Sequence, residues 1–252
     1  GAAGAERAAR LGRWVQFVEA HPELERPPAR PWIPVGLAHY AWQLSDAGAH
    51  AEAEVRARQL LERHGESPLL HLLLARARAA SGDRSAAERH LASLESGRSA
   101  EAYHYFPVDY GLLRRRGQRL LGEIREREGR LAEAERCYRR LLDQDPTDLP
   151  AALRLVCVLV QMGAYRQALD ALEACPALLD QGLAELDCLG FALTLILHST
   201  ARIAPWSRRV QDRARLSPLA AQMLQRVSQW RARAPFRLSD FPELEQGIRL
   251  RG

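Results

Sequence analysis

The chain has 252 residues, of which 47% are hydrophobic and 27% are charged, as is usual for a folded protein with one extended array or two small domains. Its formal net charge of +5 allows a weak affinity for polyanions but does not require one. No apolar run approaches the roughly 18 residues that a transmembrane helix needs, so we expect no membrane-spanning segment.

The basic residues and the cysteines bear on origin and location. All 36 lysine and arginine positions hold arginine, which we interpret as the codon bias of a GC-rich bacterial genome. The cysteines lie in predicted helices and lack the spacing of a metal site or a disulfide scaffold. They favour buried thiols in a reducing compartment, so we expect a cytoplasmic protein. A periplasmic location stays open, because a signal peptide or an anchor could have been removed.

Residues 1–31 are expected to form an N-terminal capping helix and a proline-rich linker. Leu11, Trp14, Val15 and Val18 share one face of a short amphipathic helix. Three prolines between positions 25 and 31 then favour an extended segment. The apolar face of this helix could cover the first end of a larger core.

A glycine followed five residues later by an alanine recurs at related spacings in four places. The four pairs are Gly48/Ala53, Gly82/Ala87, Gly129/Ala134 and Gly163/Ala168. Their glycines are 34, 47 and 34 residues apart, and such a period indicates one supersecondary unit that is stacked repeatedly. Glycine accepts a positive φ at a tight turn, and alanine allows two antiparallel helices to approach closely. We therefore predict two helix pairs in residues 32–101 and further pairs in residues 115–198.

The longer gap contains an aromatic insertion at residues 102–114. Three of the six tyrosines of the chain, Tyr103, Tyr105 and Tyr110, fall within it. Aromatic rings with polar tips are common on recognition surfaces, so these tyrosines are candidates for contact with a partner. The alternative is a longer helix or a loop that packs its rings over the joint between the second and third pairs.

Residues 115–148 carry the most specific pattern. It consists of Leu121-Gly122, Gly129, Ala134, Tyr138 and Asp145-Pro146. In its residue types and offsets it resembles the tetratricopeptide repeat. The resemblance implies an all-α fold, an α-solenoid of about five antiparallel helix pairs in a right-handed superhelix with capping helices.

The fifth pair is degenerate. Leu197 and Arg202 occupy the positions of the turn glycine and the small residue. We expect the second helix of this pair to be displaced or irregular and to begin late, near Pro205.

Residues 199–252 are expected to hold basic capping helices and a tail. Between Ser199 and Arg237 there are nine arginines and one acid, Asp212. A nucleic acid or an anionic membrane surface could use this stretch, whereas an acidic protein partner or a merely solubilising end explains it equally well. The tail from Phe236 to Gly252 could also occupy the protein's own groove.

In tetratricopeptide repeat proteins the first helix of each pair lines a concave groove. The resemblance places Trp42, Arg76, Arg116, Arg119, Glu123 and Phe191 among the groove-facing residues. Apolar side chains with an arginine cluster suit a peptide that carries an acidic group. The alternative is that the arginines form salt bridges with Glu123 and Glu126 on a solvated face.

No catalytic motif is present: the chain lacks a phosphate-binding loop, a nucleophile elbow and a zinc-protease signature. We therefore expect no enzyme, no cofactor and no metal. The predicted function is an adaptor that binds a protein or peptide in the groove. The alternatives are a nucleic-acid-binding or regulatory module that acts through the arginine-rich end, and the repeat domain of a larger protein. Homo-oligomerisation through an end of the stack also stays open.

Overall fold

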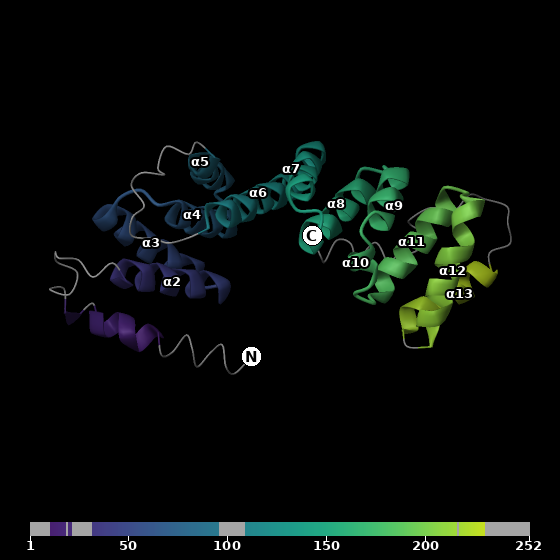
Figure 1. Cartoon of the computed structure of the whole chain (residues 1–252), viewed down its shortest axis with the longest axis horizontal. Coiled ribbons are helices and arrows are strands. Elements are labelled where there is room, and N and C mark those ends of the chain that lie inside the picture. The colour runs from purple at the N-terminus through teal and green to yellow at the C-terminus, as the bar shows by residue number, and fades with distance from the viewer. Residues whose placement is uncertain (1–10, 19, 22–31, 96–108, 216, 230–252) are drawn as a thin grey trace. The chain divides into compact units, whose positions relative to one another are not determined.

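The computed structural model describes residues 11–18, 20–21, 32–95, 109–215 and 217–229, and every regular element in these ranges is a helix (Figure 1). The chain divides into two compact units, residues 1–124 and 125–252. The predicted all-α class is confirmed. Within the described ranges, no helix combines the length and the apolar character that crossing a membrane requires.

The first unit contains a helix at residues 11–18 and the helices α2 to α6, the last of which continues past the unit boundary. Their bounds are α2 Trp32–Asp46, α3 His50–His64, α4 Pro68–Ala80, α5 Arg84–Glu95 and α6 Tyr110–Arg127. Helix α4 packs against α2, α3 and α5. Because α6 begins at Tyr110, the last residues of the predicted insertion 102–114 belong to a helix, while Tyr103 and Tyr105 lie outside the described residues.

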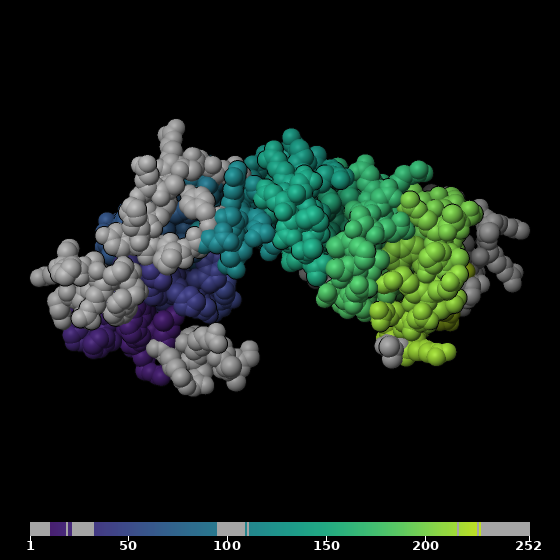
Figure 2. Space-filling view, in the orientation of Figure 1, coloured from purple at the N-terminus to yellow at the C-terminus, as the bar shows by residue number. Residues whose placement is uncertain are grey.

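The second unit contains the helices α7 to α13. Their bounds are α7 Leu131–Gln144, α8 Leu149–Gln161, α9 Tyr165–Glu173, α10 Pro176–Leu179, α11 Ala184–Ile196, α12 Thr200–Ala214 and α13 Pro218–Gln229. One hydrophobic core runs through these helices, and their side chains form a continuous surface on the face drawn in Figure 2. The Asp148 side chain caps α8 by accepting a hydrogen bond of 3.0 Å from the amide of Ala151.

The four predicted turns have the expected backbone. Gly48, Gly82, Gly129 and Gly163 all adopt a positive φ, between 72° and 85°. A side chain would be strained in this left-handed region. The alanine that follows each glycine is fully buried in the next helix. These are the two properties on which the repeat prediction depended.

The fifth pair differs from the prediction. Helix α12 begins at Thr200 and Pro205 lies inside it, so the expectation of a late start near Pro205 is wrong. His198 takes the positive φ of the missing glycine, at 49°. The small residue has moved to the first helix: a Cβ on Gly190 would lie 2.3 Å from the ring of Trp206. The pair therefore packs a large ring against a glycine, and the helix does not need to shift.

The N-terminal helix uses the same type of contact. A Cβ on Gly36 of α2 would lie 2.5 Å from the Trp14 ring. Val15 and Val18 are buried in the same core as Ile33. The amphipathic face predicted for residues 11–18 thus covers α2.

The close crossing of helices predicts a large effect of volume at the alanine positions. Ala134 is fully buried whereas Ala132, on the same helix α7, is exposed. We expect Ala134→Leu to lower the free energy of unfolding by roughly 1–3 kcal/mol through overpacking, and Ala132→Leu to change it by less than about 0.5 kcal/mol. Urea unfolding followed by circular dichroism measures both effects. Equal effects would contradict the idea that the close helix crossing limits the side-chain volume at Ala134.

Candidate functional site

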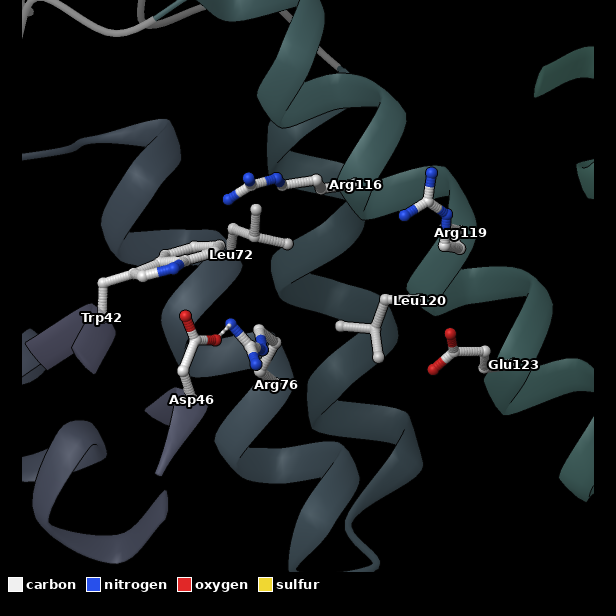
Figure 3. A pocket seen from close by; sticks show the side chains of 8 residues that line it. All are labelled: Trp42, Asp46, Leu72, Arg76, Arg116, Arg119, Leu120 and Glu123. Atoms are coloured by element: carbon white, nitrogen blue, oxygen red, sulfur yellow. Dashed lines mark ion pairs between the residues drawn. The ribbon is translucent and has the colours of Figure 1, made fainter. Parts of the chain in front are cut away.

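The helices α2, α4 and α6 of the first unit together line a pocket of about 350 Å³ (Figure 3). Each is the first helix of its repeat pair, and residues on one face of these helices converge. The lining residues are Trp42, Asp46, Leu72, Arg76, Arg116, Arg119, Leu120 and Glu123. Five of the nine residues predicted as partner-binding are therefore brought together: Trp42, Arg76, Arg116, Arg119 and Glu123.

The indole of Trp42 contacts two arginines of the pocket lining. The Cζ atoms of Arg76 and Arg116 each lie 4.8 Å from the ring centroid. In the view of Figure 3, Arg116 lies above the ring and Arg76 below it. The negative face of an aromatic ring attracts a cation at this distance. Trp42 therefore holds two guanidinium groups close to each other despite their equal charge.

The two guanidiniums have different electrostatic surroundings. Arg76 forms an ion pair of 2.8 Å, from Nη1 to Oδ1 of Asp46. Within the described part of the chain, Arg116 forms no ion pair, and its side chain is exposed. The three arginines of the lining outnumber its two carboxylates, Asp46 and Glu123, so the pocket is net positive. Leu72 and Leu120 add apolar surface beside these charges.

In the alternative interpretation of the arginine cluster, the arginines form salt bridges with Glu123 and Glu126. Arg76 instead forms its ion pair with Asp46. Glu126 is engaged within the second unit. It accepts hydrogen bonds from Tyr138 at 3.2 Å and from Gln161 at 3.1 Å, and it lies 3.7 Å from Arg154.

The other predicted partner-binding residues lie elsewhere. Phe191 is 3% exposed in the core of the second unit, because its side chain packs inward from the apolar helix α11. The prediction that its ring faces a ligand is therefore not met in this conformation. Tyr110 begins α6, and Tyr103 and Tyr105 fall outside the described residues.

Three lining residues, Asp46, Leu72 and Leu120, were not among the nine candidates, and Asp46 and Leu120 also lie outside the groove-facing positions that the resemblance gives. Both follow a predicted site residue by one helical turn, Asp46 after Trp42 and Leu120 after Arg116. Residues four positions apart share one helix face. This four-residue spacing could have identified both residues from the sequence, whereas the groove-facing positions that the resemblance gives do not include them.

The arginine-rich C-terminal region is partly neutralised within the second unit. Arg209 and Arg213 donate through Nε to the two carboxylate oxygens of Asp187, at 2.7 and 3.0 Å. Arg202 pairs with Asp170 at 2.6 Å. These arginines therefore have acidic partners on α9 and α11, which weakens the prediction of a phosphate-binding end.

A second titratable cluster joins α4 and α5 and was not foreseen. The Nδ1 atoms of His71 and His90 lie 3.1 Å apart, and Nε2 of His71 contacts the carboxylate of Glu66. One Nδ1 must donate and the other must accept, so the pair cannot carry a proton on both atoms. Burial, followed by the charges of His71 and nearby arginines, lowers the pKa of His90.

The described residues also bear on metal binding and on thiol reactivity. No group of three or more histidine, cysteine, aspartate and glutamate side chains there could hold a metal ion. The four cysteines form no disulfide, and three of them are buried. Burial, together with Asp187 and Glu185, raises the pKa of Cys188 to about 12, so this thiol is a poor nucleophile.

Comparison with known proteins identifies the repeat. A family model described as tetratricopeptide repeat matches residues 127–185. A comparison with curated proteins finds no match.

Several solved structures share the fold. YrrB, described as a TPR protein with an unusual peptide-binding site, is 14% identical with a TM-score of 0.55, covering 84% of this chain and 97% of its own. PilW, described as a widely conserved type IV pilus biogenesis factor, is 15% identical with a TM-score of 0.57, covering 88% and 96%. MamA AMB-1 is 13% identical with a TM-score of 0.55, covering 75% and 96%. At these identities the likeness concerns the fold alone.

The buried carboxylate of Asp187 predicts a stability effect. We expect Asp187→Asn to lower the free energy of unfolding by roughly 1–3 kcal/mol, because it leaves Arg209 and Arg213 without their charge partner. Both arginines are about one third exposed, at 36% and 33%, so hydration limits the loss. Urea unfolding measures it. Exposed Asp212 on the same helix as the arginines is the control, and an Asp212→Asn effect of equal size would contradict the pairing.

The His71–His90 pair predicts a pH dependence. A lowered pKa means that folded His90 takes up a proton less readily than the unfolded chain. Neutral His90 therefore contributes to stability above about pH 6.5, the ordinary pKa of histidine. This contribution is lost as the pH falls toward the lowered pKa of His90 in the folded state. We expect the unfolding free energy of the wild type to fall below this pH more steeply than that of His90→Gln. Parallel pH profiles for the two proteins would contradict this.

Proposed function

We propose that this chain, which is a tetratricopeptide repeat protein, acts as a non-enzymatic adaptor that binds an acidic peptide segment of a protein partner. The fold supports an interaction scaffold in general. The finer proposal places the peptide in the pocket of the first unit, with its acidic group on the arginines beside Trp42.

The observation that carries the proposal is the guanidinium of Arg116 held over the Trp42 ring without an internal carboxylate in the described residues. A guanidinium that is fixed in place pairs with a carboxylate at a lower entropic cost than a mobile one. Charge-assisted hydrogen bonds of this kind are roughly twice as strong as neutral ones. Arg116 therefore offers an oriented site for one acidic group.

The neighbouring residues supply the apolar part of such an interaction. Trp42, Leu72 and Leu120 lie next to the arginines. Binding energy at interfaces is concentrated in a few aromatic and arginine anchors that neighbouring side chains shield from water. YrrB shares this fold and has a peptide-binding site, so a peptide ligand is compatible with the fold.

The alternative, a nucleic-acid-binding module that uses the C-terminal arginines, has less support. Arg202, Arg209 and Arg213 already have carboxylate partners. A phosphate backbone would have to compete with these carboxylates. Steep salt dependence of binding would be its signature.

Peptide selection tests the proposal. A random peptide library displayed on phage is selected on the wild-type protein, and synthetic copies of the enriched peptides are measured by fluorescence anisotropy. We expect enrichment of acidic residues, and we expect the Arg116→Glu/Arg119→Glu variant to bind these peptides at least about tenfold more weakly, or roughly 1.4 kcal/mol. The reason is that the variant replaces attraction by repulsion.

The control carries the same change of charge on the same helix. Arg114 and Arg127 are exposed on α6 and do not line the pocket. The Arg114→Glu/Arg127→Glu variant should keep the wild-type affinity. Equal losses in both variants would show that only the net charge matters, and unchanged binding in the first variant would remove the pocket from consideration. Binding of DNA that exceeds peptide binding would favour the alternative.

A further inference from the structure

Two arginines of the pocket lie against one indole, and within the described residues only Arg76 is paired with an internal acid. Asp46 ends α2 and its carboxylate holds Nη1 of Arg76. Arg116 comes from α6 and has the ring of Trp42 as its contact. The two guanidiniums, which are equally distant from the ring, are therefore not equivalent toward an incoming anion.

The charge of Asp46 has two consequences for a ligand. It neutralises most of the field of Arg76, so a ligand acid gains little by approaching that side. Its carboxylate, which is 46% exposed, also has the same charge as a ligand acid and opposes a second acid on this side, with a strength that water screening reduces. The side of Arg116 has no such internal anion in the described residues.

We infer that Asp46 is a specificity-determining residue, which limits the pocket to a peptide with one acidic side chain next to an aliphatic residue. This inference rests on the proposed function and deepens it. Arg116 takes the single acid. Because Asp46 already holds Arg76, a second acid gains little from this arginine and meets the carboxylate of Asp46, which is specificity through an unfavourable contact.

The aliphatic part of the ligand follows from the apolar lining. Leu72 and Leu120 lie beside the arginines (Figure 3). A volume of about 350 Å³ is near the lower end of the roughly 300–1,000 Å³ typical of ligand pockets. Such a pocket fits a few side chains of a peptide.

A matched peptide set tests the inference. The most enriched peptide from the phage selection on wild type is synthesised with no acid, one acid or two adjacent acids, by exchanging glutamate and glutamine. Each peptide is titrated against the wild type, Asp46→Asn and Asp46→Glu, and circular dichroism checks that the variants fold. We expect the wild type to bind the one-acid peptide about as well as, or better than, the two-acid peptide.

In Asp46→Asn, Arg76 loses its internal partner and becomes a second site for an acid. We therefore expect this variant to bind the two-acid peptide about tenfold more tightly than the wild type does, whereas its affinity for the no-acid peptide stays the same. Asp46→Glu keeps the charge and should keep the wild-type preference. A merely structural role of Asp46 would change all three affinities together, and this outcome would overturn the inference.

A second pair of variants separates the two arginines. Asp46→Asn/Arg76→Gln removes both partners of the internal ion pair, and its affinity for the one-acid peptide should stay within about threefold of the wild-type value. Arg116→Gln should lower that affinity about tenfold. If Arg116→Gln has no effect, the proposed function itself fails. If Arg116→Gln weakens binding but Asp46→Asn leaves the preference between one and two acids unchanged, the proposed function stands and this inference is wrong.

Discussion

Each helix pair depends on a reversal of direction within a few residues, followed by a crossing at close range. A positive φ at residues such as Gly129 provides the reversal. A fully buried alanine such as Ala134 provides the crossing, because a larger side chain would separate the helix axes. The apolar faces of the helices can then pack into the cores of the two units.

The same constraint is met in a second way where the repeat pattern fails. In the fifth pair the first helix supplies Gly190, and the Trp206 ring of the second helix fills the space that a side chain would need. Gly36 accepts Trp14 of the N-terminal helix in the same manner. A small residue must lie at the contact, but either of the two helices can supply it.

The candidate site follows from this stacking. The first helices of three successive pairs contribute to it, so that Trp42 of α2, Arg76 of α4 and Arg116 of α6 converge on one pocket. The ring of Trp42 then keeps two cations close together. Asp46 pairs with Arg76, and the proposal assigns Arg116 to the acid of the ligand, so the proposed selectivity arises from this difference between the two arginines.

The sequence by itself determined the helix pairs, because backbone periodicity and turn geometry depend on neighbours along the chain. Its resemblance to the tetratricopeptide repeat implied the face on which Trp42, Arg76 and Arg116 lie. The arginine–carboxylate pairing of Asp46, the contact of His71 with His90 and the burial of Phe191 were decided by the tertiary structure alone. Each of these depends on distances between side chains of different helices. Spacing along the chain does not encode such distances, and packing fixes them.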